Sequence, residues 1–350
     1  MISIVLPVYN EQENVRAVYE RLTAEMDRLD DPYELVFVDD GSSDGSLKIL
    51  RELCQGDSCV RAISLSRNFG HQIAISAGLE HASGHAVIVM DADLQHPPEI
   101  VPELIARWKA GFDVVYTVRA GSDHAGFFKR FSAAAFYRLL NRICDVKITP
   151  NAPDFRLLDR RVVDALLQMP ERARFLRGLV NWVGFKQTAV EFVANPRLHG
   201  STKYPLSKMI RFSIDGVTAF SSVPLRLSSY MGLLAALAGV PYAVWAVYAR
   251  LFTDSVVHGW ASVIVAVLFL GGVQLIAIGI LGEYLGRIYE EVKGRPLYVA
   301  RELFGGLTPR TAELSAAGVS AERRDAIVDT AIHLPAPSKP RRQPARVLSR

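Results

Sequence analysis

The chain has 350 residues, half of them hydrophobic, and a formal net charge of +4 at pH 7. This length allows about two domains with a sizeable core, and so small a charge gives no support to a nucleic-acid-binding protein. The three cysteines lack metal-ligand spacing, which excludes a zinc site of the usual kind and favours reduced thiols in a cytosolic domain. The first residues, MISIVLPVYN, lack the basic and apolar regions of a signal peptide, so we expect the amino-terminal part in the cytoplasm.

Apolar strands and amphipathic helices alternate between Ile2 and Val118. We expect strands at residues 2–6, 34–38, 60–65, 87–90 and 113–118, and helices at 15–29, 47–53, 72–81 and 99–109. Pro7 ends the first strand, and Pro97 and Pro98 begin the last of these helices. The alternation predicts an α/β fold with a doubly wound, mostly parallel sheet and helices on both of its faces.

Acidic and polar residues follow three of these strands at the point where each ends. They are Pro7 to Glu11, Asp39-Asp40 and Asp91 to Gln95. Right-handed crossovers gather such loops at one edge of the sheet, where ligands bind in open α/β folds. Asp91, Asp93 and Gln95 would offer there the oxygen ligands that Mg²⁺ and Mn²⁺ prefer. Alone, Asp39-Asp40 is equally compatible with an ordinary βα turn, and Asp91 with Asp93 is better explained as an acidic turn. Their joint occurrence is what favours a site.

Six stretches, in this order and spacing, carry a family resemblance: LPVYNEQENV, VDDGSSDGS, NFGHQIAISAGL, MDADLQHPPE, DFRLLDRRVV and RLHGSTKY. They resemble the inverting family 2 glycosyltransferases of GT-A fold. The similarity is greatest to the polyprenyl-phosphate branch, which includes dolichyl-phosphate mannose synthases and bacterial undecaprenyl-phosphate glucosyltransferases. It covers residues 1–299, and the chain contains no GxGxxG or GxxxxGK[ST] motif that would favour a dinucleotide or P-loop enzyme instead.

The resemblance implies a set of residues that bind the nucleotide sugar and its metal. The nucleotide-sugar residues would be Pro7, Tyr9, Asn10, Glu11, Asp39, Asp40, Asp91, Ala92 and Asp93. The metal, Mg²⁺ or Mn²⁺, would be held by Asp91, Asp93 and Gln95.

The resemblance also implies the catalytic and acceptor residues. The cations Arg119, Arg197 and Lys203 would stabilise the negative charge that grows on the diphosphate, and Asp93 would act there through the metal. Arg197, Ser201 and Lys203 would also contact the acceptor phosphate. Asp154 would be the base or the group that positions the acceptor.

Alternatives remain open for several of these residues. Asp154 is also explained as an acid at an element boundary paired with Arg156 or Arg160, and the basic loop as one that only touches lipid head groups. His71 and His96 stay off the catalytic list, because a lone histidine in such a loop more often hydrogen-bonds the backbone.

Two long apolar segments, residues 227–249 and 256–282, predict a transmembrane hairpin. Basic residues flank it on both sides, so the positive-inside rule predicts a multi-pass protein of the inner (plasma) membrane with the catalytic domain and both termini in the cytoplasm. The expected parts are a cytoplasmic GT-A catalytic domain at 1–204, amphipathic juxtamembrane helices at 205–226, the hairpin at 227–282, a cytoplasmic juxtamembrane segment at 283–305 and a disordered basic tail at 306–350. Glycines within the spans permit close helix approach, so a homo-oligomer is a further hypothesis.

The function expected from these observations is transfer of one hexose, with inversion, from a nucleotide sugar to polyprenyl phosphate on the cytoplasmic membrane face. UDP-glucose is the preferred donor, because the two-span arrangement and the DFRLLDRR stretch look most like the bacterial glucosyl branch. The alternatives are a GDP-mannose-dependent mannosyltransferase and a catalytically silent membrane scaffold that binds lipid. A processive polysaccharide synthase is disfavoured, because the chain has no QxxRW-like motif.

Overall fold

The computed structural model describes residues 1–120, 152–172, 174–193, 221–252 and 260–307. Its elements in chain order are β1 (Ile2–Val8), α1 (Val15–Met26), β2 (Tyr33–Asp39), α2 (Ser46–Gly56), β3 (Val60–Leu65), α3 (His71–His81), β4 (Ala86–Val89), a 3₁₀ turn η1 (Pro98–Ile100), α4 (Val101–Lys109), β5 (Val114–Arg119), β6 (Arg156–Asp159), α6 (Arg160–Gln168), α7 (Leu176–Trp182), β7 (Gln187–Phe192), α9 (Val223–Phe252), α10 (Trp260–Val292) and β8 (Ala300–Phe304).

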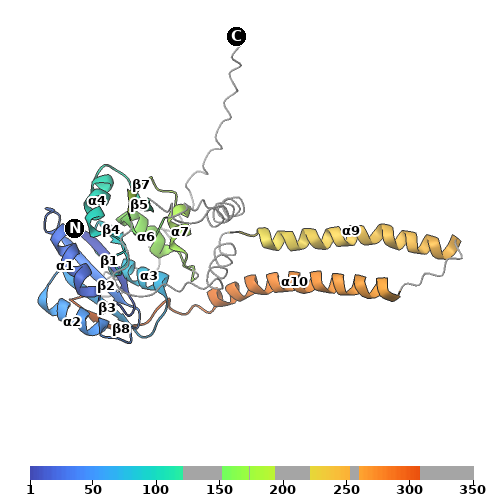
Figure 1. Cartoon of the computed structure of the whole chain (residues 1–350), viewed down its shortest axis with the longest axis horizontal. Coiled ribbons are helices and arrows are strands. Elements are labelled where there is room, and N and C mark those ends of the chain that lie inside the picture. The colour runs from blue at the N-terminus through green and yellow to red at the C-terminus, as the bar shows by residue number, and fades with distance from the viewer. Residues whose placement is uncertain (121–151, 173, 194–220, 253–259, 308–350) are drawn as a thin grey trace, which may run out of the picture. The chain divides into compact units, whose positions relative to one another are not determined.

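The strands form one sheet in the order β7-β5-β6-β4-β1-β2-β3-β8 (Figure 1). Strands β4, β1, β2 and β3 are parallel neighbours, and β5 and β7 form a second parallel pair. Strand β6 is antiparallel to both β4 and β5, and β8 is antiparallel to β3. The sheet is therefore mostly parallel, and the predicted fold class is confirmed.

Each face of the sheet buries its own apolar cluster, because successive side chains of a strand point to opposite faces. From β2, Leu35 and Phe37 pack on the face covered by α1, α2 and α4, while Val36 and Val38 pack on the face covered by α3, α6 and α7. A sheet covered on both faces explains why its central strands read as continuous apolar runs in the sequence.

Helix α3 lies close against the sheet at Gly78. A Cβ atom built there would lie 2.2 Å from Cγ1 of Val5 and 3.2 Å from Cγ2 of Val38. Neither branched side chain can move away at low cost, because both belong to strands in the buried core. The first turn of α3 carries His71 and Gln72, so this contact also fixes the position of two side chains of the site described below.

The sheet ends at a strand that follows the long helices in the chain. Strand β8 pairs with β3, the backbone amide of Ser66 donates to the carbonyl of Val299 at 2.9 Å, and Arg51 pairs with Glu302 at 2.7 Å. Sequence patterning does not predict this strand, because ARELF carries charges and has no alternating apolar pattern. The segment after α10 is therefore part of the α/β fold.

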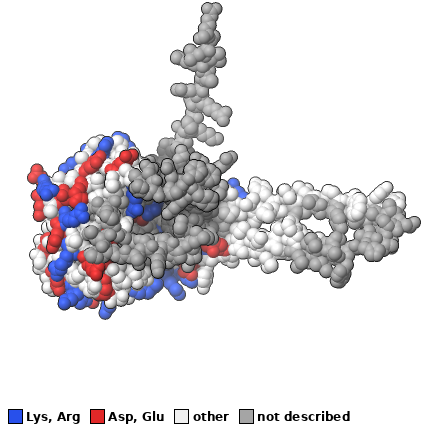
Figure 2. All heavy atoms as spheres, viewed as in Figure 1, with Lys and Arg blue, Asp and Glu red and all other residues white. Residues whose placement is uncertain are grey.

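Helices α9 and α10 contact each other and carry the two predicted spans, except that residues 253–259 lie outside the described part of the chain. Large apolar side chains on both helices are exposed, among them Leu234 at 71% and Leu275 at 72%. The space-filling view shows charged residues over the α/β sheet and almost none along these helices (Figure 2). In the described residues, the segment Phe269–Val292 is long and apolar enough to cross a membrane. The predicted amphipathic helix lies mostly outside the described residues, and so does the predicted disordered tail except for its first two residues.

We expect Gly78→Ala to destabilise the full chain by roughly 1–3 kcal/mol, because the added methyl group overlaps Val5 in a close-packed core. Thermal unfolding of the detergent-solubilised protein measures this. Gly56→Ala is the matched control, since a Cβ atom at that helix position meets nothing within 4 Å and should be neutral or stabilising. Equal melting temperatures for the two variants would contradict the close contact.

Candidate active site

The loop after β1 is joined to the loop after β2 by hydrogen bonds. The amide of Asn10 donates to Oγ of Ser42 at 3.0 Å, and Oδ1 of Asn10 accepts the amide of Ser43 at 2.8 Å. The amide of Glu11 donates to Oγ of Ser46 at 2.9 Å. Asn10 has a φ of 56°, a conformation that asparagine tolerates better than most residues. The two loops thus form one platform at the carboxyl ends of β1 and β2.

The two acids at the end of β2, Asp39 and Asp40, are buried and hydrogen-bonded. Asp39 accepts the amide of Ser42 and the hydroxyl of Ser64, and Asp40 accepts the amides of Phe69 and Gly70 at 2.7 and 2.9 Å. Burial raises the pKa of Asp40 in spite of these two donors. Asp40 therefore holds the loop that leads into α3, and the predicted nucleotide contact of both acids stays a prediction.

The acidic stretch after β4 forms a tight turn. The amide of Gln95 donates to Oδ1 of Asp93 at 3.1 Å, and Leu94 has a φ of 60°. The side chain of Gln95 accepts from Nη2 of Arg119, at the end of β5, at 3.4 Å. The turn thus brings Gln95 next to one of the predicted cations.

His96 closes this turn from inside the fold. Its ring is fully buried and stacks on Phe155 with ring centroids 5.0 Å apart. Burial lowers the pKa of His96 more than the nearby acids raise it. Its Nδ1 accepts the backbone amide of Asp91 at 3.1 Å. A ring nitrogen that accepts an N–H carries no proton, so His96 hydrogen-bonds the backbone in its neutral form, the kind of contact that the sequence favoured for it.

The donor set of Asp91, Asp93 and Gln95 fits a hard divalent cation. Its members supply two carboxylates and one amide oxygen, the ligand types that Mg²⁺ and Mn²⁺ prefer. Oδ1 of Asp91 is buried without a hydrogen-bond partner in the described part of the chain. Among those same residues, no cluster of three or more His, Cys, Asp and Glu side chains gathers. A cation here would therefore need the amide oxygen, water or a substrate to complete its shell.

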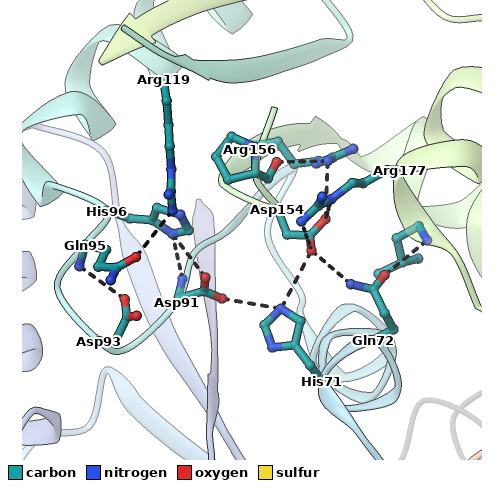
Figure 3. Close-up of polar contacts among 12 residues, drawn as sticks. His71, Gln72, Asp91, Asp93, Gln95, His96, Arg119, Asp154, Arg156 and Arg177 are labelled. Atoms are coloured by element: carbon teal, nitrogen blue, oxygen red, sulfur yellow. Dashed lines mark hydrogen bonds and ion pairs between the residues drawn. The ribbon is translucent and has the colours of Figure 1, made fainter. Parts of the chain in front are cut away.

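Asp154 is buried just before β6, and Arg177 and Gln72 hold it with three hydrogen bonds (Figure 3). Arg177 of α7 donates Nε to Oδ1 at 2.9 Å and Nη2 to Oδ2 at 3.0 Å, and Gln72 of α3 donates to Oδ2 at 2.9 Å. The fully buried Arg156 adds a longer contact of 3.4 Å. Burial alone would raise the pKa of Asp154, but His71 and the two arginines outweigh it and hold the pKa well below its usual range.

His71 lies between the two acidic parts of the site (Figure 3). Its Nε2 is 3.4 Å from Oδ1 of Asp91 and 3.7 Å from Oδ2 of Asp154. Its side chain is 45% exposed, and against partial desolvation the hydrogen bond to Asp154 and the charges of both carboxylates raise its pKa. His71 therefore connects the acidic turn after β4 with the buried carboxylate at β6.

The structure brings together Asp91, Gln95, Arg119 and Asp154, which the sequence placed in one site. Tyr9 is half-exposed beside the platform formed by the first two loops. Arg197, Ser201 and Lys203 lie outside the described residues, so their predicted contacts with phosphate stay predictions.

Three side chains of the site were not found from the sequence. The sequence disfavours a catalytic role for His71 as an isolated histidine, and it does not predict Gln72 or Arg177 as site residues. Arg177 is 23 positions from Asp154 along the chain, and no local spacing links the two. The one available signal was the position of His71 and Gln72 directly after Gly70, which starts a helix at the edge where the acids gather.

Comparisons with known proteins agree with this geometry. A family model described as glycosyl transferase family 2 matches residues 3–167, and one described as GtrB C-terminal hairpin matches residues 223–288. An uncharacterized glycosyltransferase, YkcC, of Bacillus subtilis is 51% identical over 87% of this chain and 94% of its own length. The chain belongs to glycosyl transferase family 2. The SfII prophage-derived bactoprenol glucosyl transferase of Shigella flexneri is 42% identical over 87% of this glycosyl transferase and 99% of its own length.

Asp154→Asn in this glycosyl transferase should cost roughly 3–5 kcal/mol of stability at pH 7, because it removes the counter-charge of a buried guanidinium. The contribution of the wild-type carboxylate is present above its ordinary pKa, near 4, and is lost as the pH falls through the lower pKa of the folded state. The stability difference between wild type and variant should therefore shrink below about pH 4.

Thermal unfolding of the full chain in detergent at several pH values measures this difference. Asp164→Asn serves as a control, because Asp164 is 40% exposed and pairs with Arg160 at 3.9 Å, a contact worth about 0.5 kcal/mol or less. An Asp154→Asn protein as stable as the control at pH 7 would refute the stabilising role of the cluster.

Proposed function

We propose that this glycosyl transferase moves glucose, with inversion, from UDP-glucose to the phosphate of a polyprenyl phosphate. The observation that carries the proposal is the 42% identity to a bactoprenol glucosyl transferase, which extends over both the acidic site and the hairpin helices. Bactoprenol is a polyprenol, so its phosphate is the acceptor class already expected from the sequence.

The donor would bind across the platform after β1 and β2, with its diphosphate toward the turn after β4. Asp91, Asp93 and Gln95 would hold Mg²⁺ or Mn²⁺, which when bound supplies positive charge to the diphosphate leaving group. Arg119 lies beside Gln95 and adds a fixed cation at the same place. These residues would lower the barrier by stabilising the nucleoside diphosphate as it departs.

The acceptor would approach from the side of Asp154. An oxygen of the acceptor phosphate attacks the anomeric carbon, and the bond from that carbon to the nucleoside diphosphate breaks. This oxygen is already anionic near neutral pH, so the attack needs no proton acceptor. The pKa of Asp154 lies well below its usual range, which makes it a weak base and favours a role in positioning.

The two long helices support a membrane location. Their exposed apolar surfaces would lie in the bilayer, and the family hairpin match covers both of them. We further propose that they form a two-span hairpin with the catalytic domain on the cytoplasmic face, because Arg226 precedes the hairpin and Arg287 and Lys293 follow it. The enzyme would then meet its lipid acceptor at the membrane surface.

The test is to incubate membranes containing the full chain with undecaprenyl phosphate, Mg²⁺ or Mn²⁺ and a panel of labelled UDP- and GDP-sugars. We expect label in the lipid fraction from UDP-glucose. Label from GDP-mannose alone would replace the proposed sugar and nucleotide, and no labelled lipid from any donor would refute the transferase.

Asp93→Asn should reduce this transfer by at least 100-fold while leaving the melting temperature within a few degrees, because the residue would act on the diphosphate and its metal. The Asp164→Asn variant should retain wild-type transfer. Full activity of Asp93→Asn across a range of metal concentrations would rule out its predicted role as a metal ligand.

A further inference from the structure

Two side chains from different helices fix the orientation of the Asp154 carboxylate. Arg177 forms a bidentate contact, in which its guanidinium donates one hydrogen bond to each carboxylate oxygen. Gln72 donates its amide to Oδ2 and accepts, at Oε1, the backbone amide of Leu176 at 3.1 Å. The contacts close a ring through Asp154, α3 and the first turn of α7. A bidentate fork prevents rotation of the carboxylate plane, which a single hydrogen bond would allow.

The charges around Asp154 come from each element packed against it. Arg156 lies on β6, Arg177 on α7, and His71 on α3, with Asp91 on the far side of His71. The two arginines carry more positive charge than the Asp154 carboxylate carries negative charge. An anion can therefore approach this cluster without net electrostatic repulsion, although a carboxylate lies at its centre.

We propose that Arg177 and Gln72 are positioning residues that hold the Asp154 carboxylate in the orientation needed to place the acceptor phosphate. The proposal rests on the proposed function, because it takes a lipid phosphate as the acceptor. Such an acceptor gives up no proton, so the property that the reaction needs from Asp154 is a fixed position. Misplacement of a positioning group by about 1 Å can cost about 100-fold in rate.

Three variants of the full chain in detergent test this with UDP-glucose and undecaprenyl phosphate. Arg177→Met should lower kcat/KM for the lipid about 100-fold and leave KM for UDP-glucose within about twofold. Arg177→Lys should recover part of the loss, because it restores the charge but cannot form the fork.

The pH profile separates positioning from a purely structural role. Arg177→Met removes a cation that favours the ionised carboxylate, so the acid limb of kcat/KM should move to higher pH. Gln72→Glu keeps an oxygen for the Leu176 amide but places a second carboxylate against Oδ2 of Asp154. This variant should be impaired at neutral pH and recover as the pH falls and the two carboxylates share a proton.

Arg161→Met is the matched control. Arg161 also pairs with a carboxylate, Asp113, at 2.6 Å, but its side chain is 71% exposed and outside the site. Its kinetic constants and acid limb should be those of the wild type, because an exposed ion pair contributes little to stability.

The outcomes separate the inference from the proposed function. If the wild type is active and Arg177→Met has the same kinetic constants and acid limb as Arg161→Met, the inference is overturned and the proposed function stands. If Arg177→Met shows no thermal transition and is therefore unfolded, the test rests on Gln72→Glu. A wild-type pH profile of kcat/KM in Gln72→Glu would then overturn the inference. A wild type that transfers sugar from no donor would refute the proposed function and the inference together.

Discussion

Asp154 is a buried carboxylate, and the arrangement of the site depends on how its charge is compensated. An isolated buried carboxylate would destabilise the folded state. In this structure the Asp154 carboxylate is surrounded by Arg156, Arg177, Gln72 and His71. These groups come from β6, α7 and α3, which are distant in the chain. The need to satisfy one buried charge therefore holds three elements together at the edge of the sheet.

His71 extends this constraint to the acidic turn after β4. The imidazole lies within 4 Å of both Asp91 and Asp154, so the donor side and the acceptor side of the proposed reaction share one side chain. Helix α3 can place His71 there because Gly78 lets the helix lie close against β1. A packing detail in the core thus sets the distance between two functional groups.

Two hydrogen bonds also tie the helical hairpin and the segment after it to the α/β fold. Tyr298, after α10, donates its hydroxyl to Glu80 near the end of α3 at 2.8 Å, and Glu291 of α10 accepts the backbone amide of Arg172 before α7 at 2.8 Å. Strand β8 then joins the sheet beside β3. Helix α3, whose Gln72 holds Asp154, therefore also contacts the segment after α10.

The sequence by itself determined the α/β class, the acids at the strand ends, the apolar helices and the family. These features are local: a buried parallel strand needs a continuous apolar run, and Asp91 and Asp93 are neighbours in the chain whatever the fold does. The sequence could not determine that Asp40 accepts the amides of Phe69 and Gly70 or that β8 pairs with β3. It also could not determine that Arg177 and Gln72 hydrogen-bond Asp154. Each of these depends on contacts between residues far apart in the chain, for which no spacing rule exists. Tertiary structure alone decided them, because burial sets both the cost of a charge and the partners within its reach.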